Sequence, residues 1–515
     1  MNGTSTAPKD RRRITHPGRA GAGTPANQPR AVVIGGGIAG LAATAGLAER
    51  GVSVEVLERE PYLGGRVGGW SDQLADGTPV AMNRGFHAFF RQYYNLRDLL
   101  RRTDPDLHQL TPVDDYPLID GEGRRDTFRG LPLTPPWNAL TFALRSPTFR
   151  LRDLVRINAK AAAPLATVSV PDIYHRLDHL DAAKFLQDIN FPEAAQHLAF
   201  EVFSRSFFAE PSDLSAAELA AMFHIYFLGS SEGLIFDVAT DNFDTALWEP
   251  LRNYLVGRGV TFSTGRAVSH IVTGGPSAAF RVYDDSGAVS DADAVVLATD
   301  VAGLRSIVSA SPTLGDAAWR DQVAALRSAP PFIVLRLWLD RPVRSDRPAF
   351  LGTGGRKPLD NISVLERYEH QAAEWARTQR GSVVELHAYA VPESTTSDEV
   401  RVGLLARLHE LYPETADATI VGERMLRRAD CPQFAPGDHA RRPEVRTPHD
   451  GLVLAGDGIR IDLPVALMER AATTGFTAAN HLLSGWGLRG HDLQTVPGQG
   501  RSAVLRRLAG TGGQP

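Results

Sequence analysis

Cysteine is almost absent from this chain, since Cys431 is the only one in 515 residues. A single thiol cannot build an intramolecular disulfide framework, a cysteine-rich zinc site or an iron–sulfur cluster. We interpret Cys431 as a passive thiol. A strong charge of one sign is also missing, because the net charge is −4. That balance gives no electrostatic reason to expect a nucleic-acid partner.

Long hydrophobic runs are missing too. No stretch of eighteen consecutive apolar residues occurs, so the sequence predicts no membrane-spanning helix. The N-terminus carries Arg11-Arg12-Arg13, which resembles a twin-arginine export signal, but no apolar segment follows it. We predict a disordered, mildly basic tail over residues 1–29 and a loose tail over residues 486–515.

The clearest pattern that is present begins after residue 30. An apolar run leads into Gly35-Gly36-Gly37-Ile38-Ala39-Gly40, a helix-forming segment follows, and a second apolar run ends at Glu58. This is the order of the βαβ unit that binds dinucleotides. Gly35 permits the tight turn, Gly37 lets the backbone approach a pyrophosphate, and Gly40 lets helix and strand pack closely. Glu58 is spaced to accept a hydrogen bond from a ribose hydroxyl.

Two further patterns bear on which dinucleotide is bound. Gly64-Gly65-Arg66 comes shortly after the acid, and Gly456-Asp457 ends an apolar run ahead of a long helical segment. The nucleotide-binding unit is therefore split between the two ends of the chain. This arrangement favours FAD over NAD, because simple NAD dehydrogenases need no C-terminal Gly-Asp return. No second G-x-G-x-x-G stands in a convincing context for a nicotinamide site.

The length and the 43% hydrophobic content suggest two or three lobes. We predict an α/β fold, α+β overall, in which a Rossmann-like FAD-binding domain receives an inserted substrate domain of mixed sheet and helices. The predicted FAD-binding domain comprises residues 30–100, 260–305 and 446–485. The predicted insertions are a mainly helical, substrate- or membrane-facing region over 101–259, and a sheet with helices over 306–445.

Aromatic residues gather in two places. Residues 80–96, VAMNRGFHAFFRQYYNL, place five aromatics around His87 with two arginines among them, which suits an apolar pocket with a few polar groups. The second place lies in a predicted helical region that has a helix start at Asp181 and a capping box at Ser215 and Glu218. Its aromatics are expected in helix cores, along an apolar cavity or at a membrane-facing mouth: Phe200, Phe203, Phe207, Phe208, Phe223, Tyr226 and Phe227.

Together these motifs resemble the carotenoid desaturase branch of the FAD-dependent amine oxidase superfamily. The stretch over 84–95 is similar to the G-x-H-x-F-F segment of plant-type desaturases. With residues 200–218 and 222–229, it resembles more closely the bacterial β-carotene desaturase/methyltransferases, which make isorenieratene. The resemblance covers most of residues 30–485. It implies an FAD cofactor, a carotenoid substrate, an electron acceptor such as quinone or oxygen, and a cytoplasmic protein attached peripherally to a membrane.

The resemblance also implies individual roles. The helix start near Val465 and Met468 would face the flavin ring, the strand at Val268 would pass the adenine, and Arg66 would lie against the phosphates. The expected cofactor-binding residues are Gly35, Gly37, Ile38, Ala39, Gly40, Glu58, Arg59, Gly65, Arg66, Val268, Gly456, Asp457, Val465 and Met468. The expected substrate-binding residues are Phe86, Phe89, Phe90, Tyr93 and Tyr94.

The implied reaction turns a β-ionone ring into a benzene ring. Four hydrogens leave each ring and one methyl group moves to the neighbouring carbon, so no external methyl donor is needed. Hydride loss beside the quaternary carbon leaves a cation, a 1,2-methyl shift relocates it, and proton loss gives the arene. Such a reaction needs a water-poor cavity, aromatic faces around the cation and one weak base, for which His87 is the candidate. Its alternative role is to fix the loop or touch the flavin.

Three other functions are compatible with these motifs. The chain could be an FAD enzyme with another substrate, either a desaturase of linear carotenes or an amine oxidase. It could be a prenyl-lipid carrier of the GDP-dissociation-inhibitor type, although the intact Arg66 and Asp457 speak against that. A lipid-associated structural protein has no positive feature in its favour.

Overall fold

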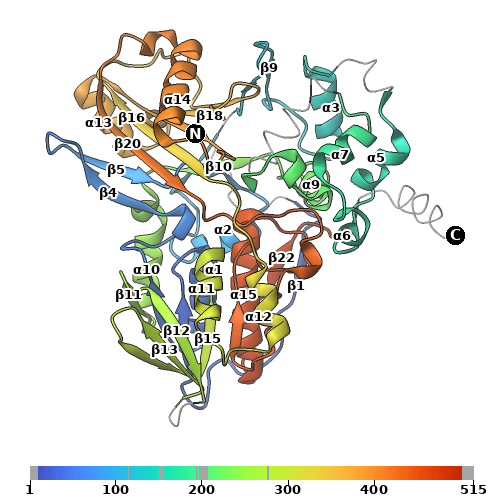
Figure 1. Ribbon diagram of the computed structural model, residues 1–515, viewed down its shortest axis with the longest axis vertical. Coiled ribbons are helices and arrows are strands. Elements are labelled where there is room, and N and C mark those ends of the chain that lie inside the picture. The colour runs from blue at the N-terminus through green and yellow to red at the C-terminus, as the bar shows by residue number, and fades with distance from the viewer. Residues whose placement is uncertain are drawn as a thin grey trace.

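The structure is a computed structural model, and its described residues are 10–113, 115–149, 156–192, 195, 207–274 and 278–500. Phe200 and Phe203, expected among the cavity aromatics, lie outside them. Figure 1 shows three regions: a nucleotide-binding sheet with its helices in the lower part, a second sheet at the upper left, and a group of short helices at the upper right. The predicted fold class, an FAD-binding α/β domain with an inserted sheet-and-helix region, is confirmed.

The nucleotide-binding sheet has five short parallel strands, most of them apolar and buried. In spatial order they are β11 (Thr261–Thr264), β3 (Ser53–Glu58), β2 (Arg30–Ile34), β15 (Ala294–Leu297) and β21 (Leu452–Leu454). These strands come from three separate stretches of the chain. Strands that are buried on both faces form continuous apolar runs in the sequence. The central strands of this sheet were therefore predictable from the sequence.

Helices α1 (Ile38–Ala48) and α15 (Leu467–Gly485) pack on this sheet and on each other. Their contact is exceptionally close, because a Cβ atom on Gly475 would lie 2.2 Å from the Ala39 carbonyl oxygen. A Cβ on Gly40 would lie 1.9 Å from the Gly35 oxygen. Gly40 therefore meets the requirement for close helix–strand packing, but it does not line the cavity described below.

Further elements surround this domain. They are the meander β12 (Val268–Thr273), β13 (Phe280–Asp284) and β14 (Val289–Ala292), the hairpin β4 (Gly69–Gln73) and β5 (Pro79–Asn83), and the helices α2 (Tyr94–Arg101), α10 (Glu249–Val256), α11 (Val301–Ser309) and α12 (Ala317–Ala324). A three-stranded sheet joins the domain to the helical region through β6 (Phe89–Phe90), β10 (Phe236–Ala239) and β7 (Leu110–Pro112).

The inserted sheet has seven strands. In spatial order they are β20 (Ile420–Arg428), β16 (Phe332–Leu339), β19 (Ser382–Ala388), β18 (Asn361–Val364), β17 (Phe350–Thr353), β8 (Leu118–Ile119) and β9 (Arg125–Asp126), with α13 (His370–Gln379) and α14 (Ser397–Leu411) beside them. The last two strands belong to the stretch predicted to be mainly helical. That stretch therefore contributes the edge of the sheet. It was not predicted, because strands of two residues are too short to show a periodic pattern.

The helical region holds α3 (Trp137–Arg145), α5 (Ala159–Ala166), α6 (Asp172–Leu177), α7 (Ala182–Asp188), α9 (Ala216–Phe223) and the π-helix His224–Gly229. The helix start at Asp181 is confirmed, since its side chain accepts from the Lys184 N–H. Only half of the predicted capping box forms. Ser215 caps α9, but Glu218 bonds two buried arginines, because an ion pair in the interior outweighs a cap bond.

The two predicted tails are partly wrong. Strand β1 (Ile14–His16) pairs antiparallel with β22 (Leu493–Thr495), so segments from both tails form one small sheet. Asn95 holds this sheet to α2, because its side-chain amide donates to the Gln494 carbonyl and accepts from the Gln494 N–H. A three-residue strand pair depends on tertiary partners, which composition does not reveal. None of the helices in the described ranges is long and apolar enough to cross a membrane.

Candidate functional site

A cavity of about 660 Å³ lies between the nucleotide-binding sheet and the inserted sheet. Its size is that of a cofactor or ligand site. The structure brings most of the predicted site residues together along its wall: Gly35, Gly37, Ile38, Ala39, Glu58, Arg59, Gly65, Arg66, Phe86, His87, Phe90, Tyr93, Val268, Gly456, Asp457 and Met468. One end is therefore glycine-rich and polar, and the other end is aromatic.

The glycine-rich end is built by two loops that touch. The Gly64 N–H donates to the Gly36 carbonyl over 2.8 Å, and a Cβ on Gly65 would come within 3.1 Å of the Gly37 Cα. Gly37 is the N-cap of α1, and it has no side chain to satisfy the first N–H groups of that helix. An open helix N-terminus without a side-chain cap is a ready site for phosphate, so this cradle fits a dinucleotide pyrophosphate.

Glu58 lies at the end of β3 where the motif requires an acid. Its carboxylate accepts from the Gly36 N–H at 2.6 Å and from the Glu60 N–H at 2.7 Å. Burial raises the pKa of Glu58, while these two backbone bonds oppose that rise. A carboxylate has further lone pairs, so the position still fits the acceptance of a ribose hydroxyl.

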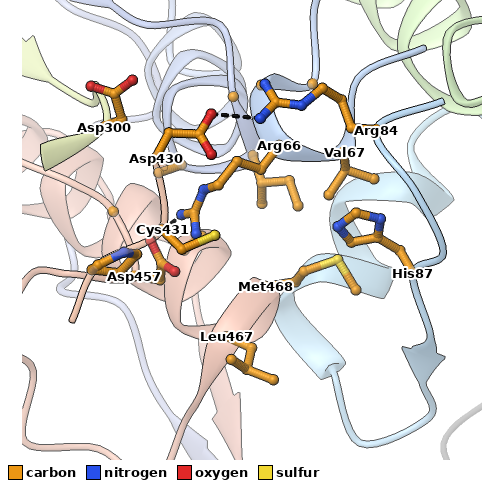
Figure 2. Close-up of a pocket in the computed structure, with 18 of the residues that line it drawn as sticks. Arg66, Val67, Arg84, His87, Asp300, Asp430, Cys431, Asp457, Leu467 and Met468 are labelled. Atoms are coloured by element: carbon orange, nitrogen blue, oxygen red, sulfur yellow. Dashed lines mark hydrogen bonds and ion pairs between the residues drawn. The ribbon is translucent and has the colours of Figure 1, made fainter. Parts of the chain in front are cut away.

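Two arginine–carboxylate pairs form the middle of the cavity (Figure 2). Arg66 pairs with Asp457, and Arg84 donates to Asp430 over 2.5 Å. Burial alone would lower the pKa of Arg66, but the Asp457 carboxylate holds it well above its ordinary value. Arg66 and Asp457 lie near opposite ends of the chain, and both were predicted to bind the same cofactor. The structure brings their side chains into direct contact. A fixed cation and anion at this position suit the polar part of FAD that links its two phosphates to its flavin ring.

The start of α15 differs by two residues from the expected one. The helix begins at Leu467, which has a positive φ of 52°, and Leu467 and Met468 line the cavity. Val465 is buried outside the cavity wall, where its carbonyl accepts from the Arg470 Nε at 3.0 Å. The expectation that Val465 contacts the cofactor is therefore wrong, because the chain turns into the helix after it.

The aromatic end is lined by rings from several elements. Phe86 lies 4.3 Å from Phe350 and Phe90 lies 4.7 Å from Tyr226, as measured between ring centroids. The other aromatic rings lining the cavity include Tyr93, Tyr116, Phe128, Phe207, Phe208, Phe236 and Tyr389. The wall therefore presents the apolar faces and edges of many rings, with few charges. Phe207, Phe208 and Tyr226 confirm that the helical region contributes aromatics to the cavity.

Phe89 and Tyr94, expected in the substrate site, do not line the cavity. Phe89 is fully buried with its ring 6.2 Å from that of Phe243, and the Tyr94 hydroxyl lies 3.3 Å from the Ser230 oxygen. The reason is the local backbone. Successive residues of the short strand β6 point to opposite faces, so Phe90 faces the cavity and Phe89 does not.

His87 lines the cavity opposite Met468 (Figure 2). Its Nδ1 lies 2.9 Å from the Gly85 carbonyl, so Nδ1 carries the proton and donates it to that bond. The other ring nitrogen is then the one able to accept a proton. Burial lowers the pKa of His87 to about 4, and the nearby positive charges of Arg66 and Arg84 act in the same direction. The imidazole is neutral at cellular pH.

A chain of polar side chains on the inserted sheet was not predicted from the sequence. The Glu385 carboxylate lies 2.8 Å from the His387 Nε2, and the His387 Nδ1 lies 2.6 Å from the Tyr389 hydroxyl, which borders the cavity. Arg336 pairs with Glu385 at 2.6 Å within the sheet. Residues two apart on a strand share a face, so the spacing of Glu385 and His387 was a usable signal. Cys431 also lines the cavity, and burial raises its pKa to about 12, so the thiol stays protonated.

Comparison with known proteins agrees with this geometry. The family of flavin containing amine oxidoreductases matches residues 38–483. The chain is 58% identical to a protein named carotenoid phi-ring synthase from Streptomyces griseus, over 97% of each chain. It is 28% identical to a protein of the same name from Chlorobaculum tepidum, over 92% of this chain and 91% of that one.

Solved structures support the fold alone. Putrescine oxidase bound to putrescine gives a TM-score of 0.64 at 15% identity, covering 90% of this chain and all of that one. Cyclohexylamine oxidase from Brevibacterium oxydans gives 0.64 at 16% identity, covering 89% and 99%. The family match and the curated relatives make this chain an FAD-dependent oxidoreductase, and the fold and cavity fit that class. The chain belongs to the flavin-containing amine oxidoreductase family, and its curated relatives place it in the carotenoid desaturase branch.

Proposed function

We propose that this enzyme aromatises the β-ionone rings of β-carotene, with an internal 1,2-methyl migration that yields isorenieratene. The observation that carries the proposal is a single cavity that joins a dinucleotide cradle to a wall of aromatic rings. The two relatives support it, because their names describe the synthesis of a carotenoid ring. A substrate with no charged group suits a wall whose many rings are interrupted by few charges.

The atoms of the proposed reaction balance without a methyl donor. Each ring loses two hydrides and two protons, and its carbon count does not change. Bound FAD supplies the acceptor for the hydrides, and the electrons then pass to an acceptor such as quinone or oxygen. One hydride and one proton leave two neighbouring ring carbons in an ordinary desaturation. The other hydride leaves the carbon beside the quaternary carbon, and a methyl group moves from the quaternary carbon to the carbon that lost this hydride. Proton loss from that same carbon then gives the third ring double bond of the arene.

The chain's own residues protect and guide this cation. Phe86, Phe90 and Tyr93 present rings to the cavity, and an aromatic face attracts a positive charge. The same rings exclude water, which would otherwise trap the cation as an alcohol. His87 is the proposed proton acceptor. It is neutral at cellular pH, and the Gly85 carbonyl holds its protonated nitrogen, leaving the other one to accept.

The test is the mass and absorption spectrum of pigments from β-carotene-producing cells that express this protein. We expect a product with four fewer hydrogens per altered ring and an unchanged number of carbons. Unaltered β-carotene beside a flavin-loaded protein would reject the substrate. The protein would then be a desaturase of other carotenes or an amine oxidase, and linear carotenes and amines offered in the same assay would distinguish the two.

The proposal includes peripheral contact with a membrane, because a carotenoid dissolves in lipid and must enter the cavity from it. Flotation of the purified protein with lipid vesicles tests this part separately from the chemistry. A protein that stays entirely in the aqueous fraction at every lipid composition would contradict it.

A further inference from the structure

Exposed apolar side chains concentrate on helix α3 and just before its start. Leu133, Trp137, Leu140 and Leu144 are 53%, 59%, 45% and 57% exposed. They are four of the nine large hydrophobic residues that are exposed in the described part of the chain, and they fall within twelve positions. The spacing of the last three, at i, i+3 and i+7, puts them on one face of the helix. A soluble protein rarely leaves such a cluster open without a partner.

The opposite face of α3 fixes the helix to the wall of the cavity. Asn138 is buried and donates through its side chain to the Phe227 carbonyl over 2.9 Å. Phe142 stacks on Phe128 with 4.8 Å between ring centroids and 12° between planes, and Phe128 lines the cavity. One ring therefore separates α3 from the aromatic end of the site. In Figure 1 the helix lies at the upper right, away from the nucleotide-binding sheet.

The charge around this helix differs from that of the whole chain. Between Asp126 and Asp172 the sequence carries five arginines and one lysine but only one acid, Asp153, although the net charge of the chain is −4. Four of these six basic residues lie in the described part of the chain and are exposed: Arg129, Arg145, Arg156 and Lys160. None of the four forms an ion pair with another described residue.

We propose that the outer face of α3 docks on an anionic lipid bilayer, with Trp137, Leu140 and Leu144 inserted at the boundary of headgroups and acyl chains. Tryptophan and leucine on one face with basic residues around them are typical of helices that lie in a membrane surface. The basic residues pair with lipid phosphates. A second copy of this chain is the weaker occupant, since a symmetric contact would bring the same arginines of both copies together.

This surface deepens the proposed function, because it would set the aromatic end of the cavity against the membrane that holds the carotenoid. Its binding to lipid does not depend on the reaction. The chain can therefore bind vesicles and yet fail to aromatise β-carotene, or make the aromatic product and yet bind no lipid. The proposed aromatisation and the proposed lipid contact of α3 therefore fail separately.

The experiment is vesicle flotation of the flavin-loaded full chain. Vesicles of phosphatidylcholine alone are compared with vesicles that also contain phosphatidylglycerol, at low and high salt. The test variant is Trp137→Ser, Leu140→Ser and Leu144→Ser combined. The matched control is Val402→Ser with Val421→Ser, which removes two side chains that are 64% and 46% exposed elsewhere on the surface.

We expect the wild type and the valine control to float with the anionic vesicles, less so at high salt. The α3 variant should bind at least about tenfold more weakly. It should still turn over carotenoid that is supplied in detergent, because these three side chains lie outside the cavity. Equal binding by the α3 variant and the wild type would overturn the proposal. So would a wild-type dimer that binds no lipid and dissociates in the α3 variant, which would assign the face to a second copy.

Discussion

At the scale of single residues, His87 is the proposed proton acceptor of the cavity. We expect His87→Ala to retain FAD, because the cofactor cradle is made by other residues, and to lose about 100-fold or more in turnover. The wild-type rate should fall as the pH drops toward 4, since protonation of the imidazole, whose pKa is about 4, removes the acceptor.

The measurement for His87 is the rate of aromatic product formation, with the flavin content of each preparation as the check on folding. His108→Ala serves as the control, since that side chain is exposed on the surface. Full activity of His87→Ala would remove the histidine from the reaction. Loss of flavin from the His87→Ala protein would instead indicate that His87 fixes the loop.

Glu218 carries a buried charge that is paired with two buried arginines. It accepts from Arg442 at 2.6 Å and from Arg470 at 2.9 Å, and all three side chains are buried. Burial alone would raise the pKa of Glu218, but the two arginines bring it down to about 2. Glu218→Gln leaves two buried cations without their counter-ion, which should cost about 3–5 kcal/mol.

Thermal or denaturant unfolding of Glu218→Gln measures this loss. Glu249→Gln is the control, because the exposed Glu249–Arg252 pair is worth well under 1 kcal/mol. The folded pKa lies below the ordinary value, so the stabilisation by Glu218 is complete above about pH 4.5 and disappears as the pH falls toward 2. A wild type and variant of equal stability at pH 7 would contradict the role of the charge.

At the scale of elements, the contact of α1 with α15 makes the cofactor cradle rigid. A side chain on Gly475 would meet the Ala39 carbonyl oxygen at 2.2 Å and the Ala42 Cβ at 2.9 Å. Gly475→Val should therefore force the helices apart, lowering the melting temperature and the FAD content together. Gly485→Ala lies on the same helix with no atom within 4 Å of the new Cβ, and it should change neither. A Gly475→Val protein with normal flavin content would show that the helices can separate harmlessly.

Some elements of the fold and the site could be predicted from the sequence, and others could not. The βαβ unit, Arg66 and the Gly456-Asp457 return were predictable, because a dinucleotide site needs fixed residue types at fixed distances along a short stretch. The pairing of Arg66 with Asp457 was only implied by their shared ligand. Phe89 and Phe90 are chemically alike, and only the pleat of β6 decides which one faces the cavity. The β1–β22 pair depends on a tertiary contact that local patterns do not encode, whereas the spacing of Glu385 and His387 was a local signal for their contact.

At the scale of the whole molecule, the cofactor site joins parts of the chain that are far apart. Residues near 35, 65, 268, 300, 430 and 457 all line the same cavity. The two Arg–Asp pairs there connect residue 66 with 457 and residue 84 with 430. A ligand that contacts all of these segments binds only when they are folded together. FAD is therefore expected to stabilise the entire fold and not one lobe of it.

Removal of FAD tests this coupling. At a free flavin concentration of 1,000 times the dissociation constant, binding to the folded state alone adds about 4 kcal/mol to the free energy of unfolding. The flavin-free protein should melt at a lower temperature, and proteases should cut it faster in the inserted sheet as well as around the glycine loops. Added FAD should restore both properties, whereas free riboflavin, which lacks the pyrophosphate for the cradle at Gly37, should restore them poorly. Equal melting temperatures with and without FAD would mean that the cavity is held open by the protein alone.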